Sequence, residues 1–172
     1  MPIDLTTRIR DVPDFPKPGV VFKDIMPLLA DADALRETVD RIAEWAGPLE
    51  PDIVLGAEAR GYITGGALAC RLGCGFVPAR KPGKLPWRTV AVKYALEYGF
   101  DQLEVHADSI RQGQRVLVHD DVLATGGTAK ATVELVEQLG GTVVGLPFII
   151  ELGFLKGRER LEGYDIFSLI EY

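Results

Sequence analysis

Cysteine and histidine are scarce in this chain, which limits the metal and redox sites that it can build. The 172 residues include two cysteines and two histidines. Cys70 and Cys74 form a C-x-x-x-C pattern without a second pair of ligands, and this spacing argues against a zinc site. We expect both to be reduced, partly buried thiols of a cytoplasmic protein.

Long apolar runs and an excess of positive charge are also lacking. No apolar stretch approaches the ~20 residues of a membrane span, and residues 1–15 contain no apolar core of a secretory signal. The 25 acidic residues outnumber the 19 Lys and Arg, which gives a formal net charge of −6. This balance argues against general binding to nucleic acids or membranes, which relies on a basic surface. An anionic substrate would need a local basic site and a metal cation for its capture.

The order of strand and helix patterns predicts one α/β domain, for which 172 residues are long enough. Strands that alternate with helices predict a mainly parallel sheet flanked by helices. The predicted strands are 20–22, 52–56, 76–80, 89–96, 102–106, 115–119, 142–150 and, at a sheet edge, 166–171. The predicted helices are a segment capped by Asp31 or Asp33 that ends near Ala46, and segments 60–72, 128–139 and 155–161. Ligands of such sheets bind beyond the carboxyl ends of the strands.

Residues 116–130, VLVHDDVLATGGTAK, carry the strongest functional signal. An apolar strand pattern leads to two adjacent acids, Asp120 and Asp121, and a T-G-G-T turn then precedes a helix pattern. The free N–H groups and the dipole of a helix N-terminus favour a phosphate, and the paired acids suit hydroxyl groups or a divalent metal. The segment therefore predicts a cradle for a ribose 5-phosphate. It lacks the spacing of a P-loop or a dinucleotide fold, and the structural alternative is an ordinary tight turn between strand and helix.

Two further segments place charged residues at strand ends. GAEARG, residues 56–61, has Glu58 and Arg60 at its tip. It is a candidate pyrophosphate site, where Arg60 and backbone N–H groups would neutralise the anion; the alternative is a helix cap with an exposed arginine. RKPGKLP, residues 80–86, is the densest cationic run of this acidic chain and lies where a mobile lid would approach the anion. Its alternative is a solvated loop.

KYALEYG, residues 93–99, adds Glu97 and Tyr98 to the far end of that lid. A glutamate near a site that excludes water could handle a proton of the substrate. The alternative, an exposed glutamate at a strand end, is equally compatible with the chemistry.

Together with FPKPGVVFKDI (15–25) and ELGFLKGRERL (151–161), these motifs resemble the adenine phosphoribosyltransferases of the type I phosphoribosyltransferase family. The resemblance covers most of the chain in the same order. It implies a single domain over residues 1–172 with the type I phosphoribosyltransferase fold, a small N-terminal hood for base recognition within residues 1–30, and a flexible lid within 81–98. It also implies a homodimer that transfers 5-phosphoribosyl from 5-phosphoribosyl 1-pyrophosphate (PRPP) to N9 of adenine. The products are AMP and pyrophosphate, as in purine salvage, and Mg²⁺ is held mainly through PRPP.

The same resemblance implies roles for individual residues. Phe22 would stack on the purine, whose edge the backbone of Val21 and Lys23 would bind; the alternative is a core role for Phe22. Asp120 and Asp121 would bind the ribose hydroxyls. The 5′-phosphate would contact Ala124, Thr125, Gly126, Gly127 and Thr128. The pyrophosphate would contact Glu58, Ala59, Arg60, Arg80, Lys81 and Lys84, with a cis peptide bond between Glu58 and Ala59. Glu97 and Arg60 would be catalytic, Glu97 acting on the base proton, and Tyr98 would belong to the lid.

Two positions depart from the family pattern. Lys23 stands where arginine is common, and His119 stands where an apolar residue is usual. We favour His119 as a hydrogen-bonded core residue over a sensor of the charge on Asp120 or Asp121.

Three other functions compete with this one: a phosphoribosyltransferase for 6-oxopurines, a PRPP-sensing regulatory domain and a generic α/β binding domain. Regulators of this kind usually carry a DNA-binding segment, and no basic helix–turn–helix pattern is visible.

Overall fold

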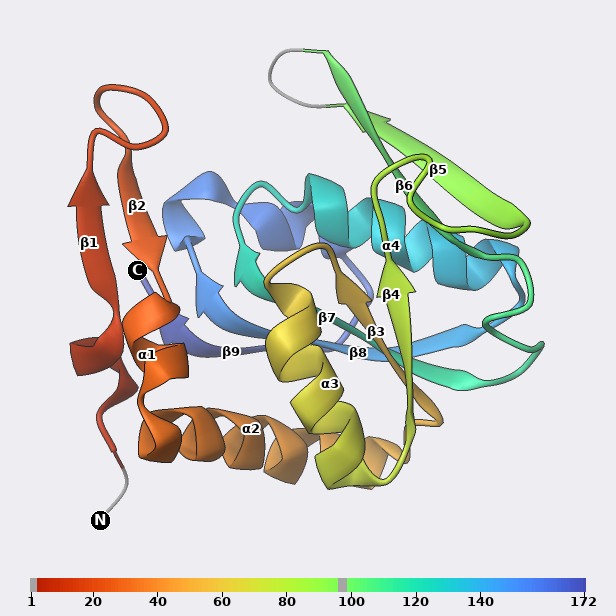
Figure 1. The fold of residues 1–172 in the computed structure, drawn as a ribbon, viewed down its shortest axis with the longest axis horizontal. Helices are drawn as coiled ribbons and strands as arrows, with labels where there is room; N and C mark the ends of the chain where they lie inside the picture. The colour runs from red at the N-terminus through yellow and green to blue at the C-terminus, as the bar shows by residue number, and fades with distance from the viewer. Residues whose placement is uncertain (1–2, 96–98) are drawn as a thin grey trace.

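The computed structural model describes residues 3–95 and 99–172, in which a central five-stranded sheet is accompanied by two antiparallel hairpins (Figure 1). The sheet has the order β4-β3-β7-β8-β9, and each pair of neighbours is parallel. Its strands are β3 (Ile53–Ala57), β4 (Gly75–Ala79), β7 (Arg115–Leu123), β8 (Thr142–Glu151) and β9 (Ile166–Glu171). The predicted mainly parallel sheet, with residues 166–171 at its edge, is confirmed.

Helices pack on both faces of this sheet and create two core layers. The helices are α1 (Met26–Ala30), α2 (Ala32–Ala46), α3 (Gly61–Leu72) and α4 (Gly127–Gln138). Successive residues of β7 alternate between the layers: Leu117 packs with residues of α2 and α3, and Val116 and Val118 pack with residues of α4. Because both faces are covered, β3 is buried along its whole length.

Asp31 caps α2, one of the two residues predicted for this role. Its side chain accepts hydrogen bonds from the backbone N–H groups of Asp33 and Ala34, both at 3.0 Å. The cap leaves the apolar stripe of α2 facing the sheet, with Val39, Ile42 and Ala43 among its buried residues.

The two hairpins lie outside the central sheet, the red to orange one along the left side of Figure 1 and the green one at its upper right. The first pairs β1 (Arg10–Pro13) with β2 (Val21–Asp24), and the second pairs β5 (Thr89–Ala95) with β6 (Phe100–His106). The irregular stretch predicted for residues 13–19 is the turn of the first hairpin and contains a cis Phe15–Pro16 bond. Strand β1 and helix α1 were not predicted, because β1 is largely exposed and α1 has five residues with a proline in its first turn.

Three expectations need correction. The strand predicted to end at His119 continues to Leu123, because Asp120 and Val122 pair with β8, so the acids lie within β7 rather than after it. Residues 155–161 form parts of two short 3-10 helices, η3 (Gly153–Leu155) and η4 (Gly157–Leu161), rather than one helix. Cys70 is exposed, and only Cys74 is partly buried.

Two other 3-10 helices, η1 (Leu5–Arg8) and η2 (Gly47–Leu49), complete the elements of the described chain. Over residues 3–95 and 99–172, no helix has both the length and the apolar character needed to cross a bilayer.

The junction between β3 and α3 leaves no room for a side chain at Gly56. A Cβ atom there would lie 2.8 Å from the backbone oxygen of Gly61 and 2.9 Å from the Phe76 ring. We expect Gly56→Ala to lower the free energy of unfolding by about 1–3 kcal/mol, because the first turn of α3 would have to move. Gly66→Ala is the control, since Gly66 lies within α3 with open space around it, and alanine favours a helix. Urea unfolding of both variants tests this; equal stabilities would contradict the packing argument.

Candidate functional site

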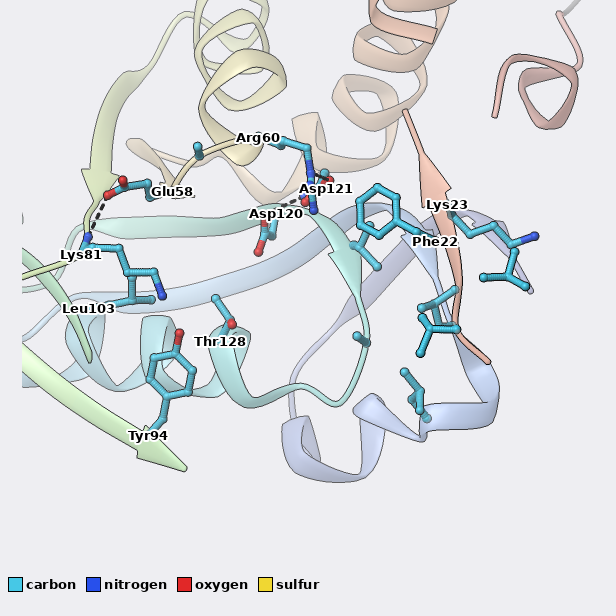
Figure 2. A pocket seen from close by; sticks show the side chains of 17 residues that line it. Phe22, Lys23, Glu58, Arg60, Lys81, Tyr94, Leu103, Asp120, Asp121 and Thr128 are labelled. Carbon is cyan, nitrogen blue, oxygen red and sulfur yellow. Dashed lines mark hydrogen bonds and ion pairs between the residues drawn. The ribbon is translucent and has the colours of Figure 1, made fainter. Parts of the chain in front are cut away.

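A pocket of about 520 Å³ opens at the carboxyl ends of the parallel strands (Figure 2). Strand β2, the end of β7 and the turns after β3, β4 and β7 contribute to its wall, together with residues of the β5–β6 hairpin and of the segment after β8. Of the residues predicted from the sequence, its wall contains Val21, Phe22, Lys23, Glu58, Ala59, Arg60, Lys81, Asp120, Asp121, Ala124 and Thr128. Segments from residue 21 to residue 128 of the sequence therefore meet at the place where ligands of such sheets bind.

The acid pair of β7 lies at the centre of this pocket, and its two members differ in environment. The side chain of Asp121 is 5% exposed and forms an ion pair with Nε of Arg60 (Figure 2). The backbone N–H of Asp121 donates to Oδ1 of Asp120 at 2.8 Å. Burial, followed by the nearby charge of Asp121, raises the pKa of Asp120 well above its ordinary value. Asp121 is therefore paired with a base, whereas burial disfavours the charged form of Asp120.

The turn after β3 packs tightly on this acid pair. A Cβ atom at Gly61 would lie 3.0 Å from Oδ1 of Asp120 and 3.2 Å from the backbone oxygen of His119. Glycine at this position allows Arg60, the N-cap residue of α3, to approach Asp121. The guanidinium carbon of Arg60 also lies 5.1 Å from the centre of the Phe22 ring. Arg60 therefore connects the aromatic wall of the pocket to the acids.

Phe22 lies on the pocket wall and is half-buried. It belongs to neither layer of the core, and its ring makes an edge contact with Phe15, with 5.2 Å between the ring centres. The side chain of Lys23 points away from Phe22 (Figure 2). Its Nζ lies 2.7 Å from a carboxylate oxygen of Asp11 and 3.9 Å from the centre of the Tyr172 ring. The face of Phe22 is thus available to a ligand, whereas the Lys23 ammonium is engaged elsewhere.

The glycine-rich turn between β7 and α4 encloses a separate small hollow of about 60 Å³, lined by residues 122–129. Gly126 adopts a φ of +81°, and α4 begins at Gly127. A Cβ atom on Gly126 would lie 2.6 Å from the backbone oxygen of Gly157, and a Cβ on Gly157 would collide with the backbone oxygen of Ala124. The turn therefore rests directly on the backbone of η4. Gly157 was not predicted as a site residue, and only its glycine identity within ELGFLKGRERL could have indicated it.

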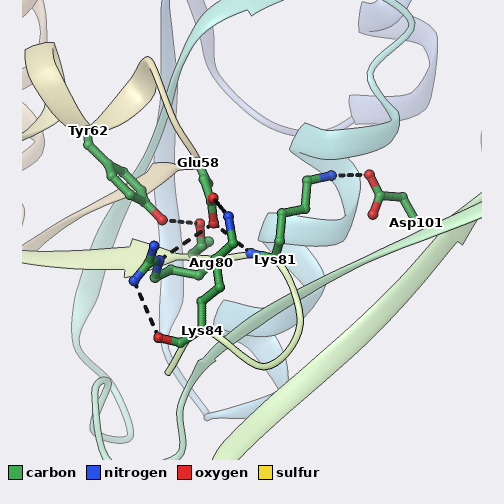
Figure 3. Close-up of polar contacts among 7 residues, drawn as sticks. Glu58, Tyr62, Arg80, Lys81, Lys84 and Asp101 are labelled. Atoms are coloured by element: carbon green, nitrogen blue, oxygen red, sulfur yellow. Dashed lines mark hydrogen bonds and ion pairs between the residues drawn. The ribbon is translucent and has the colours of Figure 1, made fainter. Parts of the chain in front are cut away.

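Glu58 contacts the basic residues that follow β4 (Figure 3). It accepts a 2.8 Å hydrogen bond from the backbone N–H of Lys81, forms an ion pair with Lys84, and lies 3.6 Å from Nε of Arg80. Burial alone would raise the pKa of Glu58, but the hydrogen bonds from Lys84 and Lys81 outweigh it and hold the pKa below its ordinary value. Arg80 and Lys84 thus contact Glu58 and lie outside the pocket wall. The peptide bond between Glu58 and Ala59 is cis, as the resemblance implied.

Tyr62, in the first turn of α3, ties this helix to the end of β4. Its hydroxyl donates a 2.7 Å hydrogen bond to the backbone oxygen of Ala79. Burial, followed by the charge of Glu58, raises the pKa of Tyr62 to about 12, so the hydroxyl stays protonated at neutral pH. The contact fixes the turn that carries Glu58 and Arg60 against the end of β4, which Arg80 follows.

The pocket also contains residues that the sequence patterns did not indicate. These are Val20, Tyr94, Leu103, Val122, Leu152 and Leu155. Tyr94 and Leu103 come from β5 and β6, whose alternating pattern predicted strands without showing which face meets the pocket. Glu97 and Tyr98, both predicted site residues, lie outside the described residues.

His119 lies in the core, as the favoured interpretation held. It is fully buried, with Nδ1 2.8 Å from the backbone oxygen of Pro147 and Nε2 2.7 Å from the hydroxyl oxygen of Thr64. A carbonyl oxygen only accepts, so Nδ1 carries the proton and Nε2 accepts from Thr64 in the neutral ring. Burial lowers the pKa of His119, although the Pro147 carbonyl and the charge of Asp121 oppose this shift.

Carboxylate oxygens are the protein groups of this pocket that suit a hard cation, and Asp120 and Asp121 present them side by side. Among the residues that the structure describes, no three or more His, Cys, Asp or Glu side chains converge as a metal-binding group.

Comparison with known proteins identifies extensive similarity. The phosphoribosyl transferase domain family matches residues 25–169. The adenine phosphoribosyltransferases of Desulfitobacterium hafniense and Thermotoga maritima are each 56% identical over 99% of this chain and 98% of their own. The solved structure of the adenine phosphoribosyltransferase from Thermoanaerobacter pseudethanolicus has a TM-score of 0.96 at 51% identity, covering 98% of both chains. The enzyme from Saccharomyces cerevisiae, complexed with adenine and an imino-altritol bisphosphate, has a TM-score of 0.91 at 38% identity, covering 96% of both chains.

The buried, neutral His119 should make stability depend on pH. Its pKa is lowered in the folded state, so between that pKa and the unfolded value of about 6.5 the unfolded chain binds more protons. Stability is therefore lost as the pH falls below 6.5. We expect the difference in free energy of unfolding between the natural protein and His119→Val to fall by about 1 kcal/mol from pH 7.5 to pH 5.5. Urea unfolding at both pH values measures this; a constant difference would rule out the contribution.

Proposed function

Since the chain belongs to the adenine phosphoribosyltransferase family, we propose that it transfers the 5-phosphoribosyl group of PRPP to adenine in purine salvage. The products are AMP and pyrophosphate. The observation that carries this proposal is the composition of one pocket. An aromatic ring, a pair of acids and the basic residues Arg60 and Lys81 line it. The glycine-rich helix start and the basic residues Arg80 and Lys84 lie next to it. These are the chemistries needed by a base, a ribose, a phosphate and a leaving pyrophosphate.

Adenine stacks on Phe22 in this proposal, and the backbone of Val21 and Lys23 binds its edge. The position of Lys23 supports the second part, because its ammonium is held by Asp11 and only its backbone is left to face the base. The usual arginine at this position can therefore be replaced by lysine without loss of a base contact.

The ribose hydroxyls bind Asp120 and Asp121, and the 5′-phosphate binds the turn of Ala124, Thr125, Gly126, Gly127 and Thr128. The N-terminal turn of α4 leaves N–H groups without intrahelical partners, and these point at the phosphate. Gly126, with its positive φ, gives this turn its curvature.

Substitution takes place at the anomeric carbon. The lone pair of N9 forms the new bond, the bond to pyrophosphate breaks with its electron pair leaving on oxygen, and positive charge builds on the ribose ring. Asp120 and Asp121 lie beside that ring. Its positive charge favours the ionised form of Asp120 and so opposes the effect of burial on the pKa of that carboxyl. The acids therefore stabilise the charged ring more than the neutral substrate.

Negative charge on the leaving pyrophosphate is received by Arg60, Lys81, Lys84 and Arg80, with backbone groups of Glu58 and Ala59 beside them. Arg60 has two partners in this scheme, since it also contacts Asp121. Its guanidinium can bind the carboxylate through Nε and present its remaining N–H groups to the pyrophosphate.

Magnesium fits the oxygen chemistry of this pocket. A bound Mg²⁺ would supply positive charge that neutralises the pyrophosphate group. We propose that it is held mainly through PRPP, because Mg²⁺ is usually bound by one or two carboxylates together with substrate phosphates. Asp120 and Asp121 are the carboxylates at hand.

Three further parts of the proposal rest on the family resemblance. Glu97 handles the base proton at N7, and Tyr98 belongs to the lid. The protein is a homodimer, and it works in the cytoplasm. Both cysteines are free thiols, which agrees with a reducing compartment.

Base preference is the direct test of the proposed reaction. The protein is incubated with PRPP, Mg²⁺ and adenine, hypoxanthine, guanine or xanthine in separate reactions, and nucleotide and pyrophosphate are measured. We expect AMP and an equal amount of pyrophosphate from adenine, and little product from the 6-oxopurines, whose hydrogen-bond pattern is reversed at one edge. Faster conversion of a 6-oxopurine would assign a different base, and no product from any base would reject the reaction.

Neutralising Asp121 should weaken PRPP binding. The Asp121→Asn variant loses the charged acceptor for the ribose and the partner of Arg60, so we expect the dissociation constant for PRPP to rise about 10- to 100-fold. Calorimetry with PRPP and Mg²⁺ measures it. Glu44→Gln, on the exposed side of α2, is the control for loss of one negative charge. Unchanged PRPP affinity in Asp121→Asn would contradict the proposed ribose site.

A further inference from the structure

The inner face of the β5–β6 hairpin carries a carboxylate that the proposed reaction does not use. Tyr94 and Asp101 are directly opposite each other in the hairpin register, so their side chains share one face, and Leu103 lies two residues further along the same face. Tyr94 and Leu103 line the pocket. Asp101 is therefore held beside the pocket by its register partner and its neighbour in β6.

Asp101 is fixed by several contacts at once. The backbone N–H of Gln102 donates to Oδ1 at 2.8 Å, and the hydroxyl of Tyr94 donates to Oδ2 at 3.2 Å. Oδ2 also forms an ion pair with Nζ of Lys81 (Figure 3). Burial alone would raise the pKa of Asp101, but the hydrogen bonds from Lys81 and Gln102 outweigh it, and the pKa lies below its ordinary value. The carboxylate is thus ionised at neutral pH.

Lys81 is tied to a carboxylate at each end. Its backbone N–H donates to Glu58 at 2.8 Å, and its ammonium reaches across to Asp101 on the hairpin. Its side chain forms part of the pocket wall between these two points (Figures 2 and 3). The side chains of Lys81 and Asp101 are 37% and 27% exposed, so water and solutes can reach the pair.

The Lys81–Asp101 pair is also connected, through Tyr94, to the glycine-rich turn that is proposed to bind the 5′-phosphate. A Cβ atom on Gly127 would lie 3.6 Å from Cδ2 of Tyr94, which places the tyrosine ring against the start of α4. Lys81, Asp101 and Tyr94 therefore form one connected row from the turn after β4 to the glycine-rich turn.

On this geometry, and given the proposed function, the structure assigns Asp101 as a positioning residue of the pyrophosphate site. It holds the Lys81 ammonium at the pocket wall in the ligand-free protein and releases it to the pyrophosphate group of the substrate. Pyrophosphate offers several charged oxygens to an ammonium that has three donors, so the exchange is favourable. The bond to Asp101 must be broken first, and this lowers the affinity for pyrophosphate. The product is consequently released more easily.

A purely structural role for the pair makes the opposite prediction. If the ion pair only fastened the hairpin to the turn after β4, its removal would loosen the pyrophosphate site and weaken binding. Binding of pyrophosphate to variants of Asp101 therefore distinguishes the two roles. A carboxylate that competes for Lys81 weakens binding, whereas one that only fastens the hairpin supports it.

The experiment is calorimetric titration with pyrophosphate and Mg²⁺, at one ionic strength, of the natural protein, Asp101→Asn, Lys81→Met and the double variant. We expect Asp101→Asn to lower the dissociation constant about two- to fivefold, the range of a partly exposed ion pair. The same substitution should change nothing in the Lys81→Met background, because no ammonium is left to release. Asp108→Asn, in the exposed turn after β6, changes the net charge equally and should leave the affinity unchanged.

An unchanged or higher dissociation constant in Asp101→Asn would overturn the assignment. Equal tightening in the Lys81→Met background or in Asp108→Asn would do so too, since the effect would then be one of general charge. Thermal melting verifies folding, and Asp101→Ala, with the same expected tightening, replaces Asp101→Asn if that variant does not fold. Turnover of PRPP and adenine by the natural protein separates the two proposals. Turnover without tightening rejects only the role of Asp101, whereas absence of turnover rejects the proposed function itself.

Discussion

The ion pair between Arg60 and Asp121 joins the parts of the pocket that the chain brings from different elements. Asp121 is buried within β7, and Arg60 begins α3, so their contact fixes the turn after β3 against the central strand. Gly61 makes this approach possible, because a side chain there would meet Asp120. The same guanidinium lies near the ring of Phe22 and thereby orients the hairpin of β1 and β2 toward the acids. A buried carboxylate requires such a partner, and removal of Arg60 would leave the side chain of Asp121, 5% exposed, desolvated and unpaired.

Charge pairing around the pocket determines which anions this acidic chain can bind. The chain carries a formal charge of −6, yet its proposed substrate is strongly anionic. Around the pocket, basic residues are held by carboxylates of their own chain: Lys84 by Glu58, Lys81 by Asp101 and Arg60 by Asp121. The basic run after β4 is therefore less positive than its sequence indicates. An anionic ligand must exchange with these carboxylates, so binding is selective for groups with more charge and more acceptors than one carboxylate offers.

Much of the fold could be predicted from local patterns. The buried strands, the cap at Asp31, and the parallel order with an edge strand at residues 166–171 follow from hydrophobic periodicity and capping chemistry. The end of β7 could not be predicted, because two aspartates have low strand propensity. The strand continues through them because it pairs with β8. The site follows the same division. The acids and the glycine-rich turn were indicated by residue type, and Phe22 was indicated by the family resemblance. Tyr94, Leu103 and the Lys81–Asp101 pair depend on hairpin register and on tertiary contact, which a single sequence does not encode locally.

The contact between Gly126 and Gly157 makes two distant parts of the chain interdependent. The turn at the start of α4 rests on the backbone of η4 with no side chain between them. An insertion, or a bulkier residue at Gly157, would displace the turn as surely as a change within the turn itself. Chimaeras that exchange the C-terminal segment between relatives must therefore preserve the backbone path through residues 153–161, whatever side chains they introduce there.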